Sequence, residues 1–250
     1  MKHPRALIIG DSHAEAIKRG LASMKLPEGI DIRAYRQFKL KDDKRLGDVS
    51  VDDFLRLCDE LGPEDLLVSV LGGNQYNAFG LVQHPQAFDF HCPDWPLLPP
   101  LAGHEPIPYR VLLDYFVSAY RGKDGGLLEN IVSKTAAKVV CCCPPPPKED
   151  SQLILKRHET LFVQQGLLDR GVTSASIRLK LWSTQWAALR VVAGKLGCEA
   201  WPVPPGCQTS AGFLDSRFSA DDATHGNEAY GRLVVEQIAE RLTQQTASIP

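Results

Sequence analysis

Short apolar runs alternate along the chain with longer stretches of helical spacing. Continuous apolar runs are typical of strands covered on both faces, and they predict strands at roughly 5–9, 31–35, 66–71, 138–143 and 198–203. Apolar residues that recur every three to four positions predict amphipathic helices. These helices are expected at roughly 12–24, 51–61, 110–120, 126–135, 151–168, 176–196 and 227–243.

The alternation of strands and helices predicts the fold class. Strands separated by helices favour a parallel sheet, so we expect an α/β protein, a three-layer α/β/α sandwich around a five-stranded parallel sheet. Sites in such sheets form beyond the carboxyl ends of the strands. Two short polar motifs, Gly10-Asp11-Ser12 and Gly72-Gly73-Asn74, follow predicted strands at that edge.

Residues 77–109 depart from this pattern. The segment is rich in proline and aromatic residues, contains three of the seven histidines, and shows no clear period. A stretch of this length without secondary structure of its own is usually functional or disordered, and its aromatic content argues against disorder. We expect an insertion or lid beside the site, in which His84 and Trp95 contact the substrate.

Length and composition set limits on the rest. A chain of 250 residues with 44% hydrophobic content predicts one domain over 1–250. With 23% charged residues and a net charge of −2, nucleic acid is not an expected partner. No run is long enough to span a membrane, and the first strand begins too early for a signal peptide to precede it, so a cytoplasmic location is expected.

The cysteines favour the same compartment. Their number, seven, is odd, and Cys141 to Cys143 are consecutive, which does not suggest a disulfide framework. Free buried thiols are expected. No Cys-x-x-Cys spacing or glycine-rich phosphate loop occurs, so neither a metal nor another cofactor is expected.

The first candidate motif is Gly10-Asp11-Ser12-His13. A serine between a strand end and a helix start is exposed above the sheet, close to free backbone N–H groups, which suits a nucleophile. The alternative is an ordinary helix start in which Asp11 or Ser12 is a cap.

The second candidate motif is Asp222-Ala223-Thr224-His225. A serine nucleophile needs an adjacent base, usually a histidine that a carboxylate orients. An aspartate three residues before a histidine can place both side chains on one side of a turn. By itself such a pair is common, and His225 has the alternative of being a surface or core residue.

The third candidate motif is Gly72-Gly73-Asn74. An asparagine just past a strand can direct its side-chain amide into a cleft, where an acyl-transfer oxyanion needs such a donor. Taken alone, the motif is equally well explained as a turn, because these residues tolerate positive φ.

Together the motifs resemble the SGNH hydrolase superfamily, the GDSL-like lipases and esterases. The order matches: Gly-Asp-Ser near the start, Gly-x-Asn after the third strand, and Asp-x-x-His before the last helix. A glycine between the first and third motifs completes the pattern, and Gly47 fits it. The resemblance extends from Gly10 to the last helix and implies an SGNH or flavodoxin-like sheet.

The resemblance implies a role for each matching residue. Ser12 would be the nucleophile, His225 the general base and Asp222 the residue that orients it. The oxyanion hole would consist of the Ser12 and Gly47 N–H groups and the Asn74 side chain. His13 departs from the family pattern, which has leucine there. We expect it on the helix surface, with contact to substrate as the alternative.

The implied activity is hydrolysis of a small-molecule or glycan ester, with short acyl or acetyl groups, through an acyl-enzyme. Two alternatives remain. The same residues would serve an O-acyltransferase that passes the acyl group to a sugar hydroxyl. A non-catalytic carbohydrate-binding domain on the same fold would need none of this chemistry.

Overall fold

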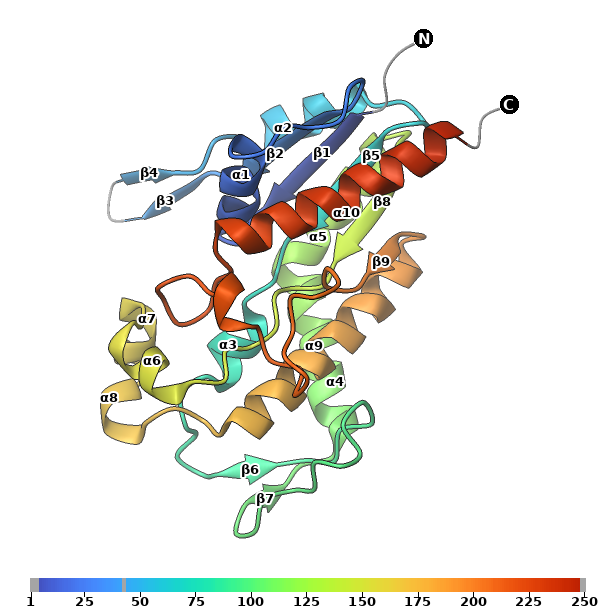
Figure 1. Cartoon of the computed structure of the whole chain (residues 1–250). Helices are drawn as coiled ribbons and strands as arrows, with labels where there is room; N and C mark the ends of the chain where they lie inside the picture. Colours follow the sequence, from blue (N-terminus) through green and yellow to red (C-terminus); the bar gives the residue numbers. More distant parts are fainter. Residues whose placement is uncertain (1–4, 42–43, 248–250) are drawn as a thin grey trace.

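A five-stranded parallel sheet forms the centre of the computed structural model, which describes residues 5–41 and 44–247 (Figure 1). Its strands are β1 (Arg5–Gly10), β2 (Asp31–Arg36), β5 (Leu66–Val70), β8 (Lys138–Cys142) and β9 (Glu199–Trp201). They lie in the order β2-β1-β5-β8-β9, and every neighbouring pair is parallel. The five predicted strands and the α/β class are confirmed, with boundaries within about two residues.

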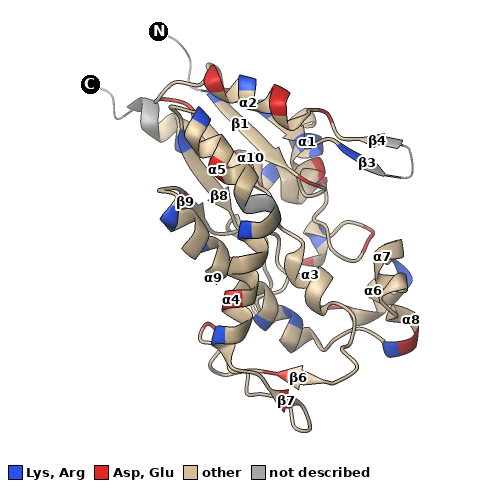
Figure 2. Ribbon diagram, turned by 180° about the vertical axis from the view of Figure 1, so that it is seen from behind, with Lys and Arg blue, Asp and Glu red and all other residues tan. Residues whose placement is uncertain are grey.

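Helices cover both faces of the sheet, as continuous apolar strands require. On one face, Ile8, Val68 and Val140 pack with α1 and α10. On the other face, Ile9, Leu67 and their neighbours pack with helices α2, α4, α5 and α9 (Figures 1 and 2). The bounds are α1 (Ala14–Ala22), α2 (Val51–Asp59), α4 (Tyr109–Ala119), α5 (Gly126–Lys134), α9 (Ala175–Lys195) and α10 (Glu228–Ala247). The predicted sandwich is confirmed.

The strand order sets the place of the candidate site. The connection from β1 to β2 leads to one side of β1, and β5 lies on the other side, so the order reverses between β1 and β5. Ligands of open α/β sheets bind at such a switch point, beyond the carboxyl ends of the strands. Ser12 follows β1 and Asn74 follows β5, so both lie at this point.

Several elements were not predicted. Strands β3 (Lys39–Lys41) and β4 (Lys44–Leu46) pair antiparallel after β2. Helix α3 (Gln75–Gly80) begins immediately after Asn74, and a π-helical turn at Tyr120–Gly125 joins α4 to α5. A 3₁₀ turn at Ser216–Phe218 precedes the Asp222 motif. None of the helices in the described part of the chain combines the length and hydropathy of a bilayer crossing.

The single helix predicted over 151–168 is wrong. The region forms three short helices, α6 (Ser151–Lys156), α7 (Thr160–Gln164) and α8 (Leu167–Arg170), and Gly166 has a φ of +85°. A straight helix would separate Phe162 and Leu167 by about 140° around its axis. The breaks allow both side chains to enter one buried cluster with Ile154 and Ala223.

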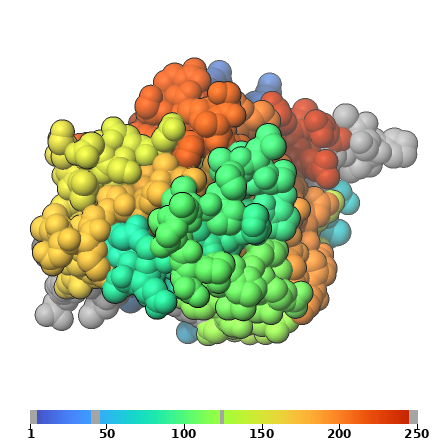
Figure 3. Space-filling view, turned by 90° about the horizontal axis from the view of Figure 1, so that it is seen from below, coloured from blue at the N-terminus to red at the C-terminus, as the bar shows by residue number. Residues whose placement is uncertain are grey.

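The segment 77–109 contains secondary structure that was not predicted, whereas its role as a lid stays a prediction. Its first residues belong to α3, and two short strands, β6 (Phe88–Asp89) and β7 (Glu105–Pro106), pair within it. Lys180 of α9 donates to the Asp89 carboxylate at 2.7 Å, and both side chains are almost fully buried. The other Asp89 oxygen accepts the Leu101 N–H at 2.9 Å. This segment, green in Figure 3, is therefore fixed to the body of the protein by a buried charge.

We expect Asp89→Asn to destabilise the protein by about 3–5 kcal/mol, because it leaves the Lys180 ammonium buried without a charge partner. Urea unfolding measures the change. Arg110→Gln is the control, because its pair with Asp114 is exposed on α4, and its loss should barely change the free energy of unfolding. Equal losses in the two variants would contradict this account of the segment.

Candidate active site

Ser12 lies in the turn between β1 and α1, and its side chain does not cap the helix. The Ser12 hydroxyl lies 2.8 Å from His225 Nε2, whereas the His13 N–H is received by the Asp11 carboxylate at 3.3 Å. The helix-cap alternative for Ser12 thus does not describe its side chain. The structure brings together two residues that are 213 positions apart in the chain.

Asp222 organises the turn that carries His225. Its Oδ1 accepts the backbone N–H groups of Thr224 and His225 at 2.9 and 2.8 Å. Its Oδ2 lies 2.9 Å from His225 Nδ1. A carboxylate only accepts hydrogen bonds, so Nδ1 carries the proton and Nε2 is left to accept the Ser12 hydroxyl proton. This arrangement explains why an aspartate three residues before a histidine suits the site.

The surroundings of Asp222 keep it ionised. Burial opposes the charge, but the hydrogen bond and charge of His225, its backbone N–H and the nearby Lys148 outweigh burial. They hold the pKa of Asp222 well below its ordinary value. The carboxylate is therefore charged at neutral pH and can stabilise an imidazolium at His225.

Lys148, in the segment between β8 and α6, contacts this turn. Its ammonium is buried and donates to the Ala220 and Asp222 carbonyls, each at 2.6 Å, and to Asp222 Oδ1 at 3.2 Å. Burial lowers the pKa of Lys148, and the Asp222 charge opposes that shift. The buried Arg178 guanidinium in turn donates to the Lys148 and Glu149 carbonyls at 2.9 and 2.8 Å.

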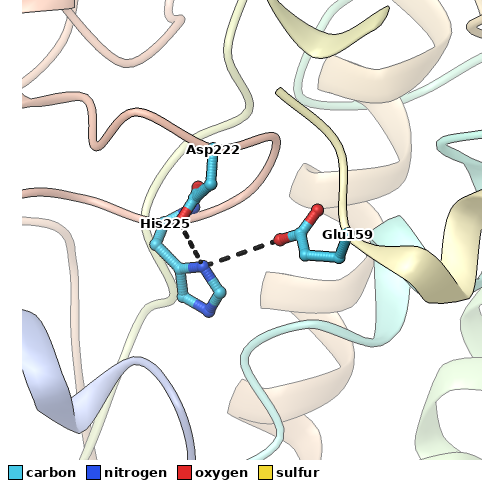
Figure 4. Close-up of side chains that lie close together, drawn as sticks. All are labelled: Glu159, Asp222 and His225. Atoms are coloured by element: carbon cyan, nitrogen blue, oxygen red, sulfur yellow. Dashed lines mark hydrogen bonds and ion pairs between the residues drawn. The ribbon is translucent and has the colours of Figure 1, made fainter. Parts of the chain in front are cut away.

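A second carboxylate, Glu159, faces the same histidine (Figure 4). Glu159 Oε1 lies 3.7 Å from His225 Nδ1 and accepts the Thr224 hydroxyl at 2.8 Å. A carboxylate oxygen of Glu159, a carboxylate oxygen of Asp222 and a ring nitrogen of His225 lie within 4.8 Å of one another. A cation can bind at this spacing. The buried Lys148 ammonium beside Asp222 opposes a second cation, and His225 Nδ1 is already engaged, so these residues do not fit a metal well.

Two of the predicted oxyanion donors are backbone groups. Within the described part of the chain, neither the Ser12 nor the Gly47 N–H donates to a protein acceptor. Gly47 has a φ of +102°, and a Cβ there would lie 2.4 Å from the Gln37 carbonyl. Only glycine fits this close turn. The turn is joined to the sheet, since the Gln37 N–H donates to the Gly10 carbonyl at 2.8 Å.

The third predicted donor, Asn74, has one half of its amide engaged. Asn77, a buried residue of α3, donates its side-chain NH₂ to Asn74 Oδ1 at 2.8 Å. This bond fixes which end of the Asn74 amide is the acceptor, so the NH₂ group of Asn74 remains for another partner. Asn77 thus orients a residue that the sequence motif identified.

His13 corrects one expectation. It is not on the helix surface: only 7% of the residue is exposed, and its ring centroid lies 4.8 Å from that of His225. Gly73 provides the space, because a Cβ there would lie 2.6 Å from the His13 ring. Burial first, and then the charge of His225, lower the pKa of His13 to about 4, so it is neutral at pH 7. Whether it contacts substrate stays a prediction.

A cleft of about 390 Å³ opens at Ser12 and His225. Apart from those two residues, its lining consists of Glu15, Ala16, Arg19, Arg36, Ser219, Ala220, Asp221, Asp222, Gly226, Asn227 and Glu228. The lining includes no residue of 77–109, and neither Gly47 nor Asn74 belongs to it. His84 is exposed and Trp95 packs over Gly212, so the structure does not bring either to this cleft. Their contact with substrate stays a prediction without support from the lining.

Sequence reasoning missed four residues of the site. Lys148, Glu159 and Arg178 act through partners that are distant in the chain. Asn77 acts on Asn74, three residues before it. One signal was present, because Lys148 follows a predicted strand and so lies at the same edge of the sheet as Ser12 and Asn74. Glu159 lay inside a helix predicted to be continuous and carried no signal.

Comparison with known proteins gives similar solved structures only. Neither a scan of known protein families nor a search of curated proteins finds a match. Similar structures include a carbohydrate acetylesterase from Sinorhizobium meliloti, with 14% identity and a TM-score of 0.45. The match covers 96% of this chain and 99% of the acetylesterase chain. An aryl esterase from M. smegmatis has 13% identity and a TM-score of 0.47, and the match covers 97% of this chain and 99% of the aryl esterase chain.

A GDSL-like lipase from Bacteroides thetaiotaomicron has 14% identity and a TM-score of 0.47, with 97% of this chain and 89% of its own covered. The three names are those of two esterases and a lipase.

We expect His13→Leu to flatten the pH dependence of stability between pH 6.5 and about 4. In that pH range His13 is protonated in the unfolded chain but stays neutral in the folded chain. The free energy of unfolding of the wild-type protein therefore decreases as the pH falls. Urea unfolding at several pH values gives the slope. An unchanged slope in His13→Leu would show that other groups cause the loss.

Proposed function

We propose that this protein is a serine ester hydrolase that acts through an acyl-enzyme. One observation carries the proposal: a continuous hydrogen-bonded path from the Ser12 hydroxyl through His225 to Asp222, with distances of 2.8 and 2.9 Å. A hydroxyl, an imidazole and an ionised carboxylate in this order form a nucleophile, its base and the group that orients the base.

In the first step, His225 Nε2 removes the proton from the Ser12 hydroxyl as its oxygen attacks the ester carbonyl. The imidazolium that forms keeps its Nδ1 proton on Asp222, whose negative charge stabilises it. The carbonyl oxygen becomes an oxyanion, for which the Ser12 and Gly47 N–H groups and the Asn74 side chain are the donors. Collapse expels the alcohol, which takes the proton from His225 Nε2.

In the second step, water attacks the acyl group on Ser12. His225 Nε2 accepts the proton of the water and then returns it to the Ser12 oxygen as the acid leaves. The same base therefore serves both halves of the reaction. The donors around the carbonyl oxygen also serve twice, because an oxyanion forms in each half.

The cleft lining favours a short acyl group and a polar alcohol. Its apolar side chains are only Ala16 and Ala220, whereas serine, asparagine and charged side chains form most of the rest. Long acyl chains need a large apolar surface for burial, which this lining does not offer. We propose an acetyl or similar ester of a polar, carbohydrate-like alcohol.

We also propose a reducing, cytoplasmic location. All seven cysteines are free, and six of them are buried. Burial raises the pKa of Cys142 and Cys58, each to about 12, so these thiols stay protonated and unreactive. Thiols of this kind are typical of proteins kept in a reducing compartment.

We expect Ser12→Ala to reduce hydrolysis of short p-nitrophenyl esters and acetylated sugars to background, because it removes the nucleophile. A fluorophosphonate probe should label the wild-type protein at Ser12 and leave Ser12→Ala unlabelled. A wild-type rate in Ser12→Ala would refute the proposal. Release of free acetate, compared with its transfer to an added glycan, separates a hydrolase from an acyltransferase.

We expect Asn74→Ala to lower kcat by about 10²- to 10³-fold, because one donor to the oxyanion is lost while nucleophile and base remain. Steady-state kinetics on the same esters measures the effect. Asn130→Ala, an exposed change on α5, is the control and should keep the wild-type kcat. A normal kcat in Asn74→Ala would remove Asn74 from the oxyanion hole.

A further inference from the structure

We propose that Glu159 is a second carboxylate for the His225 imidazolium, a positioning residue that shares with Asp222 the charge that forms on His225. The inference rests on the proposed function, because it assigns a role within the same reaction. Neither the sequence motifs nor the resemblance they carry involves Glu159. It is carried by the contacts of the Glu159 carboxylate (Figure 4).

Glu159 reaches His225 through two routes. Directly, its Oε1 lies 3.7 Å from His225 Nδ1, which is within ion-pair distance but beyond a hydrogen bond. Indirectly, Oε1 accepts the Thr224 hydroxyl at 2.8 Å, and the same hydroxyl oxygen lies 3.2 Å from Nδ1. The Thr224 hydroxyl therefore fixes the carboxylate in place beside the ring nitrogen.

The Glu159 carboxylate is one-third exposed, but one of its two oxygens lacks a partner among the described residues. Its second oxygen, Oε2, is buried and has no hydrogen-bond partner in the described part of the chain. A buried carboxylate oxygen without a partner costs free energy. Lys148 is a nearby cation that interacts with Glu159, but its ammonium is hydrogen-bonded to Asp222. An imidazolium at His225 would supply the missing charge during the reaction.

The break between α6 and α7 is what presents this carboxylate. Glu159 is the extended residue just before α7, with φ −81° and ψ 151°, and its carbonyl accepts the Phe162 N–H at 3.0 Å. Phe162 is buried in the cluster that also contains Ala223 of the His225 turn. Packing of this cluster thus fixes Glu159 relative to Thr224 and His225.

The charged and titratable groups around His225 predict the direction of the effect. Asp222 and Glu159 lie at Nδ1, Ser12 lies at Nε2, neutral His13 lies across the ring, and Lys148 lies behind Asp222. Removing the Glu159 charge leaves Asp222 as the single anion there. Protonation of His225 then becomes less favourable, so the enzyme should stay active at lower pH.

The first experiment measures kcat/KM against pH for Glu159→Gln. We expect the acid limb to move to lower pH by about half a unit to one unit, and kcat at the optimum to fall about three- to tenfold. Glu159→Asp keeps the charge, so its acid limb should lie between those of the wild-type protein and Glu159→Gln. Glu149→Gln removes an exposed carboxylate of the same region and should leave the acid limb in place.

The second experiment is a double-mutant cycle with Asp222→Asn, which keeps an acceptor for the turn but loses the charge. In that background Glu159 is the remaining carboxylate at Nδ1. We therefore expect Glu159→Gln to lower kcat/KM by a factor at least about threefold larger than in the wild-type chain. Should Glu159→Gln fail to fold, Thr224→Val removes the bridging hydroxyl and should move the acid limb in the same direction.

The outcomes separate this inference from the proposed function. Loss of activity in Ser12→Ala, together with an unmoved acid limb in Glu159→Gln or strictly multiplicative effects in the cycle, would overturn the role of Glu159 alone. Activity in Ser12→Ala at the wild-type rate would overturn both. A shifted acid limb with a non-multiplicative cycle supports Glu159 as the second carboxylate.

Discussion

The ionised carboxylate of Asp222 is the interaction on which the site depends. It receives the N–H groups of Thr224 and His225, the ring proton of His225 and the Lys148 ammonium. The same group therefore shapes the turn, selects the tautomer of His225 and holds the turn against the segment between β8 and α6. A neutral residue of equal size would satisfy the backbone but not the ring or the ammonium.

Buried cations join the loops of this protein to its sheet and helices. Lys148 joins the segment before α6 to the Asp222 turn, Arg178 holds the segment around Lys148, and Lys180 fixes the 77–109 segment through Asp89. Most of their hydrogen bonds go to backbone carbonyls, which compensates part of the cost of burial. Long irregular segments thus keep defined positions without regular secondary structure.

The sequence predicted what depends on local pattern. The five strands were evident because runs such as Leu66–Val70 are buried on both faces, and the three motifs were evident because each follows a strand or precedes a helix. Features that depend on distant partners were not evident from the sequence. His13 is buried because Gly73, 60 positions away, has no side chain, and Glu159 faces His225 because the helix around it breaks to bury Phe162.

The chain length between Ser12 and His225 has a consequence for synthesis. Ser12 leaves the ribosome long before His225, which lies just ahead of α10. Until that last part of the chain has emerged and docked, Ser12 is an ordinary alcohol with no base beside it. Under the proposed function, a nascent or truncated chain would thus present Ser12 without the base that activates it, and probe labelling at Ser12 would report that folding is complete.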